Sequence, residues 1–174
     1  MRTRIYPVLR LIPLVLALCL ALSACGGGET APIKKGETYR DFTATLADGG
    51  SFTLSEEEGK VILLNFWATW CGPCVMEMPA FPRLIEKYGD RLCLVAANCA
   101  EDEQTVKKFL SDNGYTFPVV LDPEGTVAAL YPTDSIPYTL IIAPNGKVVH
   151  IATGAGDADS MFEYYSNEID RALE

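Results

Sequence analysis

The sequence has little of what several large classes of protein require. Histidine occurs once, at His150, so a cysteine–histidine hydrolase or a histidine-based metal site would lack its second residue. Basic residues are few, 14 Lys and Arg against 23 Asp and Glu, and the formal net charge of -9 excludes a nucleic-acid-binding surface built on phosphate contacts. The chain also contains no phosphate-binding loop, no dinucleotide fingerprint and no internal repeat. We therefore expect no cofactor.

No apolar run in the sequence is long enough to span a bilayer as a helix. Three arginines, Arg2, Arg4 and Arg10, precede an apolar stretch that ends at residue 24 after about 14 residues, whereas a spanning helix needs about 18 or more. A charged start followed by a short apolar run is typical of an export signal. We predict that residues 1–24 are a cleaved signal peptide. Retention as a short membrane anchor is the alternative.

The residues at the end of this run resemble the lipobox of bacterial lipoproteins, in which an apolar residue and two small residues precede a cysteine. Here they are Leu22, Ser23, Ala24 and Cys25. The resemblance implies that Cys25 carries lipid and anchors the protein outside the cytoplasm, at the bacterial cell membrane. Cleavage removes three of the 14 basic residues, and 11 minus 23 gives a net charge of -12, so lipid rather than basic charge would hold the chain at the membrane.

The rest of the chain is predicted to be a tether followed by one domain. Residues 25–38 comprise the lipidated cysteine and a stretch rich in glycine and small polar residues, which is typical of a flexible linker. Residues 39–174 have the length of one ordinary domain. Their periodicity predicts an α/β fold with helices on both faces of a central sheet.

The individual elements follow from the spacing of apolar residues and from turn signals. The predicted strands are two hairpins, 41–46 with 51–54 and 139–142 with 147–151, and three buried strands, 61–67, 91–97 and 117–121. The predicted helices are 71–88, bent at Pro79 and Pro82, then 101–111, and a last helix after Asp157, with Asp157, Asp159 and Ser160 as capping candidates.

The residues that could form a reactive site lie where the buried strand 61–67 meets the following helix. Cys71 and Cys74 lie one helical turn apart, and unpaired backbone N–H groups at a helix start lower the pKa of a thiol. Cys71 is the candidate nucleophile and Cys74 the candidate resolving thiol. A structural disulfide is one alternative. A zinc site with Cys93 and Cys99 is another, although their spacing does not match a second CxxC pair; we expect no metal.

The segment Asn65-Phe66-Trp67-Ala68-Thr69-Trp70-Cys71-Gly72-Pro73-Cys74, followed by Glu77-Met78-Pro79, resembles the TlpA/ResA-like branch of the thioredoxin family. Ser135-Ile136-Pro137-Tyr138-Thr139 and Pro144-Asn145-Gly146-Lys147 extend the resemblance toward the C-terminus. It implies a thioredoxin fold with an added N-terminal β-hairpin and a membrane-attached, extracytoplasmic thiol-disulfide oxidoreductase.

The resemblance also implies roles for individual residues. Glu77 shares a helix face with Cys74 and would accept its proton, with a solvated surface glutamate as the alternative. Thioredoxin has an aspartate where this chain has Asn65, which cannot titrate, so the proton would pass to Glu77 or to water. Pro137 matches the family's cis-proline opposite the cysteines.

Substrate binding would involve five residues around the cysteine pair. The backbone at Ile136 and Pro137 could pair with an extended substrate segment, Trp70 would add apolar surface, Gly72 leaves room for a partner chain, and Pro73 presets the first helical turn.

The family suggests the partners. They are disulfide-containing exported proteins such as apocytochrome c, in cytochrome c maturation, and a membrane thiol donor of the CcdA/DsbD type. Reduction of a methionine sulfoxide reductase, peroxiredoxin-like peroxide reduction and noncatalytic partner binding are the alternatives. Cys93 is predicted as a small core residue, and no role follows for Cys99.

Overall fold

The computed structural model describes residues 30–174. The predicted signal peptide and the predicted lipidation site at Cys25 lie outside the described residues. Within them, no helix combines the length and the hydropathy that crossing a membrane would require.

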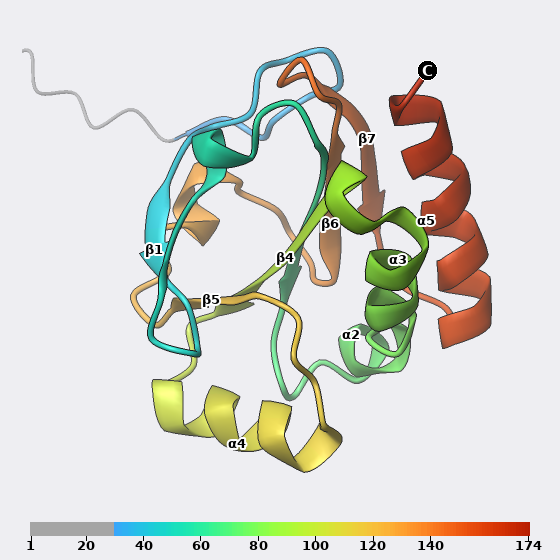
Figure 1. Cartoon of the computed structure of the whole chain (residues 1–174). Helices are drawn as coiled ribbons and strands as arrows, with labels where there is room; N and C mark the ends of the chain where they lie inside the picture. The colour runs from blue at the N-terminus through green and yellow to red at the C-terminus, as the bar shows by residue number, and fades with distance from the viewer. Residues whose placement is uncertain (1–29) are drawn as a thin grey trace, which may run out of the picture.

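The domain is a five-stranded mixed sheet with a separate two-stranded hairpin (Figure 1). The strands are β1 (Thr43–Thr45), β2 (Ser51–Thr53), β3 (Val61–Trp67), β4 (Leu92–Cys99), β5 (Val119–Asp122), β6 (Tyr138–Ile142) and β7 (Val148–Thr153). The α-helices are α2 (Gly72–Glu77), α3 (Ala80–Tyr88), α4 (Glu103–Asn113) and α5 (Ala158–Ala172), and the 3-10 helices are η2 (Leu54–Glu57), η3 (Gly89–Arg91) and η4 (Ala128–Leu130).

Strand β3 lies at the centre of the sheet, whose order is β5-β4-β3-β6-β7. It pairs in parallel with β4 and antiparallel with β6. All seven of its residues are buried, as expected for a near-continuous apolar run with neighbours on both edges and both faces. The functional residues therefore extend from the most protected strand of the fold.

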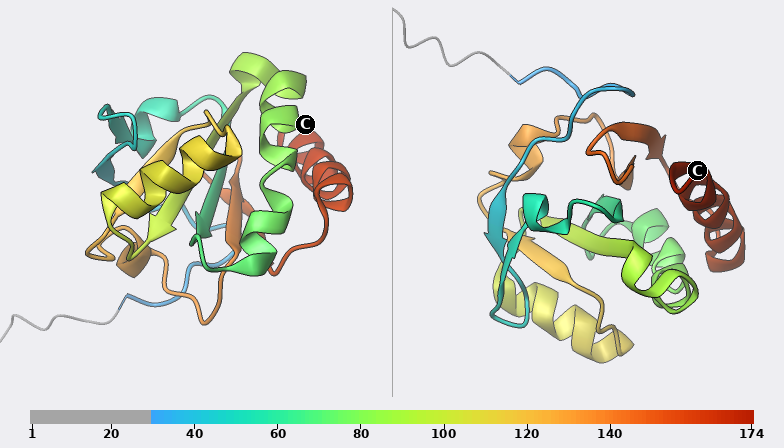
Figure 2. Two further views of the ribbon diagram at one scale, coloured as in Figure 1. Left: turned by 90° about the horizontal axis from the view of Figure 1, so that it is seen from below. Right: turned by 45° about the horizontal axis from the view of Figure 1, so that its top comes forward.

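The two faces of the sheet are covered differently. Leu63 and Trp67 of β3 belong to the hydrophobic cluster that includes residues of α3, α4 and α5. Ile62, Leu64 and Phe66 point the other way, into a cluster formed with the N-terminal segment, the hairpin and residues around η2 and η4. Helices α3 and α5 lie side by side in both sets of views (Figures 1 and 2). The predicted fold class is confirmed: α-helices cover one face of the sheet, and the 3-10 helices η2 and η4 lie on the other.

The prediction of one helix over 71–88 is wrong, because the structure has two shorter helices there. Two helices replace it, α2 ending at Glu77 and α3 beginning at Ala80 with Pro79 as its N-cap. A proline inside a helix removes one hydrogen bond and clashes with the carbonyl four residues earlier, so the helix breaks there. Pro82 causes no second break because it lies in the first turn of α3, where N–H groups have no intrahelical acceptor.

Part of the segment assigned to the tether packs against the domain. Ile33 is buried, and Gly36 and Glu37 exchange backbone hydrogen bonds with Val148 of β7. An isolated bridge joins Thr38 to Lys147. The packed part of the chain therefore begins at residue 33, six residues before the boundary that composition suggested, and it covers one end of the edge strand β7.

Candidate functional site

The cysteine pair lies at the junction of β3 and α2. Cys71 is the N-cap of α2, and its Sγ accepts a hydrogen bond of 3.2 Å from the backbone N–H of Cys74. A disulfide joins the two residues, whose Cα atoms are 5.2 Å apart. Cys71 is 5% exposed and Cys74 is fully buried. Of the two sulfurs, that of Cys71 is therefore the one nearer to solvent.

The residues around Cys71 form an exposed apolar surface. Trp70 is 72% exposed, the highest value among the large apolar side chains of the described residues, and Met76 of α2 is also exposed. Gly72 and Pro73 are exposed, and a Cβ atom at Gly72 would meet nothing within 4 Å. Trp67, in contrast, is buried and packs against Phe109 of α4 with ring centroids 5.2 Å apart.

The Ile136–Pro137 peptide bond is cis. Pro137 immediately precedes β6, whose first residue, Tyr138, pairs with Phe66 near the end of β3, so the proline lies beside the strand that leads to the cysteines. Ile136 is half-buried and packs against the cluster that contains Cys71 and Cys74. The backbone carbonyl of Pro137 accepts a hydrogen bond from Gly154.

Glu77 is fully buried at the end of α2, which rules out the solvated surface glutamate that the sequence left open. Its Oε1 accepts a hydrogen bond of 2.8 Å from Asn65 Nδ2, and its Oε2 accepts one of 2.9 Å from the Tyr165 hydroxyl. Burial raises the pKa of Glu77 to about 7, and the two hydrogen bonds oppose this rise. A carboxyl with this pKa can both accept and release a proton near neutral pH.

Two residues of this network were not predicted from the sequence. Tyr165 of α5 and Thr139 of β6 are buried, and their hydroxyl oxygens are 3.0 Å apart. Asn65 Nδ2 also donates to Thr139 Oγ1, at 2.9 Å. The available signal was a polar residue inside each of two otherwise apolar strands, Asn65 in β3 and Thr139 in β6, because a buried polar side chain needs a partner.

Glu101 is a second acid near the cysteines, and its role was not predicted from the sequence. Its Oε2 accepts hydrogen bonds of 2.7 Å from the Thr69 backbone N–H and from Asn98 Nδ2, and its Oε1 accepts one from the Thr69 hydroxyl. Ala100, next to it, has a φ of 57°, a left-handed conformation that is uncommon for a residue other than glycine. Glu101 thereby fixes the loop that presents Trp70 and Cys71.

The remaining cysteines and the histidine lie away from this site. Cys93 is buried in β4, as predicted, and Cys99 at the end of β4 is half-buried. Burial raises the pKa of Cys93 to about 12 and that of Cys99 to about 11, so both thiols stay protonated. His150 contacts Glu168 and Tyr164 at the edge of the sheet. Among residues 30–174, no cluster of three or more acidic, histidine or cysteine side chains could hold a metal ion.

Comparison with known proteins identifies the family. The model of the AhpC/TSA family matches residues 35–151. The thiol-disulfide oxidoreductase ResA of Geobacillus thermodenitrificans is 35% identical over 153 residues, which cover 83% of this chain and 88% of that protein. This similarity confirms the resemblance that the cysteine motif indicated.

Solved structures agree with the sequence relatives. The Chlorobium tepidum protein assigned as thiol:disulfide interchange protein DsbE is 33% identical with a TM-score of 0.75, over 82% of this chain and 99% of that one. The exposed lipoprotein thioredoxin of Streptococcus pneumoniae is 26% identical with a TM-score of 0.64, over 74% of this chain and 99% of that one. The chain therefore belongs to the AhpC/TSA family and is a thiol-disulfide oxidoreductase of the ResA-like group.

Proposed function

We propose that this oxidoreductase reduces disulfides in exported proteins, with the haem-site cysteines of apocytochrome c as its substrate. The observation that carries the proposal is a Cys71–Cys74 disulfide that forms at the start of α2, three residues before a buried carboxyl with a pKa of about 7. The names ResA and DsbE among the relatives support the class of reaction.

The reaction proceeds in two exchanges. In the reduced protein the Cys71 thiolate attacks one sulfur of the substrate disulfide, a mixed disulfide forms, and the other substrate sulfur leaves as a thiolate. Cys74 then loses its proton to Glu77 and attacks Cys71 Sγ, which releases the second substrate thiol. The substrate gains two electrons, and the protein is left with the Cys71–Cys74 disulfide that the structure contains.

Substrate binding would use the exposed surface beside Cys71. Trp70 offers apolar contact area, and Gly72 and Pro73 leave the approach to Cys71 open. Ile136 and Pro137 would contribute backbone groups for an extended segment on the other side of the cysteines.

We also propose that Cys25 carries lipid and that the oxidised pair is reduced again by a membrane thiol donor of the CcdA/DsbD type. The lipobox and the description of the pneumococcal relative as an exposed lipoprotein support the anchor. Cys25→Ser should move the protein from the membrane fraction to the soluble extracytoplasmic fraction. Membrane association that survives this substitution would contradict lipid anchoring and would favour a retained N-terminal helix.

Two measurements test the direction of electron transfer and the identity of the substrate. Titration against glutathione should give a reduction potential at or below about -220 mV; a value near about -120 mV would identify a disulfide-forming oxidant instead. The Cys74→Ser variant, reduced and mixed with an oxidised haem-site peptide, should accumulate a mixed disulfide at Cys71. Trapping of a methionine sulfoxide reductase in place of the peptide would redirect the proposal to that substrate.

Cysteine variants also distinguish disulfide reduction from peroxide reduction and from noncatalytic binding. Peroxide turnover that survives Cys74→Ser would indicate a peroxiredoxin-like reaction, which needs a single peroxidatic cysteine. A phenotype that survives Cys71→Ser would indicate a noncatalytic partner-binding role. Loss of peptide reduction in both variants, without peroxide turnover, is the result that the proposed function predicts.

A further inference from the structure

A chain of three hydrogen bonds connects two buried hydroxyl groups to Glu77. It runs from Asn65 Nδ2 to Thr139 Oγ1 at 2.9 Å, from Thr139 Oγ1 to the Tyr165 hydroxyl at 3.0 Å, and from Tyr165 to Glu77 Oε2 at 2.9 Å. A fourth bond of 2.8 Å joins Asn65 Nδ2 to Glu77 Oε1 and closes a ring. None of the four side chains is more than 1% exposed.

Counting protons fixes the direction of this chain. The Asn65 amide donates one proton to Glu77 Oε1 and the other to Thr139 Oγ1. Tyr165 has a single phenolic proton, which it donates to Glu77 Oε2, so the contact between the two hydroxyls must use the proton of Thr139. Burial raises the pKa of Tyr165, which therefore remains a donor. Every proton in the ring points toward the carboxylate.

The protonated form of Glu77 fits the same ring poorly. A proton on Glu77 Oε2 would have to be donated to the Tyr165 hydroxyl, so Tyr165 would have to turn its own proton toward Thr139. The Thr139 proton would then point at Asn65 Nδ2, which is itself a donor and cannot accept it. The remaining acceptor, Asn65 Oδ1, has no hydrogen-bond partner among the described residues and lies on the other side of the amide. With the Asn65 amide oriented as in the structure, the ring is therefore complete only when Glu77 is ionised.

We propose that Tyr165 and Thr139 are positioning residues of this site, whose hydroxyl chain holds Glu77 ionised and oriented to take the proton of Cys74. The inference rests on the proposed function, since it assigns Glu77 as that proton acceptor. It makes the C-terminal helix and strand β6 part of the acid–base machinery, although neither carries a cysteine. When Glu77 receives the proton, the Cys74 thiol becomes the thiolate that attacks Cys71.

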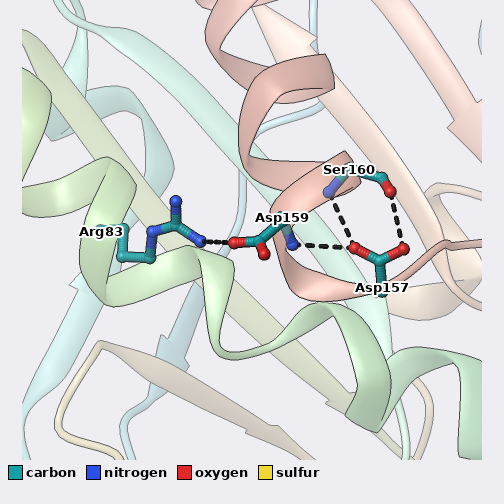
Figure 3. Close-up of polar contacts among 4 residues, drawn as sticks. All are labelled: Arg83, Asp157, Asp159 and Ser160. Atoms are coloured by element: carbon teal, nitrogen blue, oxygen red, sulfur yellow. Dashed lines mark hydrogen bonds and ion pairs between the residues drawn. The ribbon is translucent and has the colours of Figure 1, made fainter.

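Helix α5, which carries Tyr165, is held against α3 by side-chain contacts. Arg83 of α3 pairs with Asp159 at 2.6 Å, and Asp157 accepts hydrogen bonds from the N–H groups of Asp159 and Ser160 (Figure 3). Arg83 also stacks over the ring of Phe162, 4.2 Å from its centroid. One helical turn after Tyr165, Ile169 is fully buried against the same core. These contacts lie on both sides of Tyr165 along α5 and set the depth at which Tyr165 meets Glu77.

The direct test is a titration of the Glu77 carboxyl carbon by NMR in the oxidised full chain. Tyr165→Phe keeps the ring and removes the donor, and we expect the Glu77 midpoint to rise by about one pH unit or more. Tyr164→Phe is the matched control, because the Tyr164 hydroxyl contacts His150 and not Glu77; its midpoint should equal that of the wild type. An unchanged midpoint in Tyr165→Phe would overturn the proposal.

A kinetic experiment separates a positioning role from a structural one. We expect Tyr165→Phe to shift the pH profile for oxidation of the reduced chain by glutathione disulfide, and to cause no shift in a Glu77→Gln background. An equal effect in both backgrounds would overturn the proposal. If Tyr165→Phe does not fold, the two Thr139 variants serve instead. Thr139→Val should raise the Glu77 titration midpoint, and Thr139→Ser should keep it at the wild-type value. Equal midpoints in these two variants would overturn the proposal.

Different results would contradict the proposed function and the positioning role of Tyr165 and Thr139. A wild-type chain that does not exchange with glutathione disulfide would contradict the proposed function whatever the NMR midpoints are. Normal exchange with identical midpoints in wild type and Tyr165→Phe would contradict the positioning role alone.

Discussion

The partners of Glu77 explain why its carboxyl remains able to exchange a proton. Moving a carboxylate out of water costs several kcal/mol, and proteins commonly offset this cost with a cation. None of the ion pairs within residues 30–174 involves Glu77. Glu77 has the neutral hydrogen-bond donors Asn65 and Tyr165 in place of a cation. A cation would lower the pKa of Glu77 far below neutrality, whereas neutral donors leave it at about 7.

The variant Glu77→Gln tests the proton transfer. The wild-type rate constant for resolving the mixed disulfide should increase with pH through about 7 as Glu77 ionises, because only the ionised form can accept the Cys74 proton. The variant should lack this inflection and be slower at pH 8 by about a hundredfold. Rapid-quench mass spectrometry of the mixed disulfide measures the step. Glu86→Gln, an exposed glutamate of α3, is the control and should retain the wild-type profile.

Glu101→Gln tests the loop that presents Cys71, the proposed nucleophile. The neutral amide keeps one oxygen for the Thr69 N–H and Asn98, but its NH2 group replaces the oxygen that accepts from the Thr69 hydroxyl, and all three hydrogen bonds lose their charge. We expect a loss of about 1–3 kcal/mol in the free energy of unfolding, measured in urea, and slower attack by Cys71. Glu103→Gln, which removes only a solvent-exposed pair with Lys107, should change stability by less than about 0.5 kcal/mol. Equal effects would contradict the role of Glu101.

The sequence was informative for residues close to the cysteines and uninformative for those brought there by folding. Cys71, Cys74 and Glu77 share one short segment, so their spacing alone indicates a common site. Tyr165 lies 88 residues from Glu77 along the chain and occupies an apolar helix stripe, where a tyrosine resembles an ordinary core residue. Only the packing of α5 against α2 and α3 reveals that its hydroxyl has a partner.

At the scale of elements, local signals predicted which segments form strands and helices better than they predicted where these end. The strand 61–67 was predicted with its observed bounds, because every residue in it except Asn65 is apolar and it begins directly after Lys60. Strand β4 continues to Cys99, beyond the predicted residue 97, because Asn98 and Cys99 pair with Leu121 and Asp122 of β5. That pairing depends on a neighbouring strand and leaves no mark in the local sequence.

The start of α5 offers a prediction at this scale. Asp157 is the N-cap, and its carboxylate accepts hydrogen bonds from the N–H groups of Asp159 and Ser160 and from the Ser160 hydroxyl (Figure 3). Asp157→Ala should cost about 1 kcal/mol of unfolding free energy. Asp159→Ala removes only the exposed ion pair with Arg83 and should cost less. Thermal unfolding followed by circular dichroism measures both; a larger loss in Asp159→Ala would show that the ion pair, not the cap, fixes the helix.

At the scale of the molecule, the proposed acid–base network draws on both halves of the chain. Asn65 and Glu77 come from the β3–α2 unit, and Thr139 and Tyr165 come from β6 and α5. Strands β3 and β6 are antiparallel neighbours, with Asn65 paired opposite Thr139. The sheet register therefore sets the distance between the first two groups, and a slip of one residue would turn Thr139 to the opposite face. The site is complete only in the fully folded domain.

This coupling predicts how global stability depends on pH. Folding raises the pKa of Glu77 from 4.5 to about 7, so between these values the folded chain keeps a proton that the unfolded chain releases. The corresponding stability is fully present below pH 4.5 and is lost as the pH rises through 7, a change of about 3 kcal/mol. Glu77→Gln cannot titrate, so its unfolding free energy relative to that of the wild type should increase by about this amount between pH 4 and pH 8. Urea unfolding of the oxidised proteins measures the difference, with Glu86→Gln expected to parallel the wild type; a parallel curve for Glu77→Gln would show that the buried carboxyl does not change its pKa on folding.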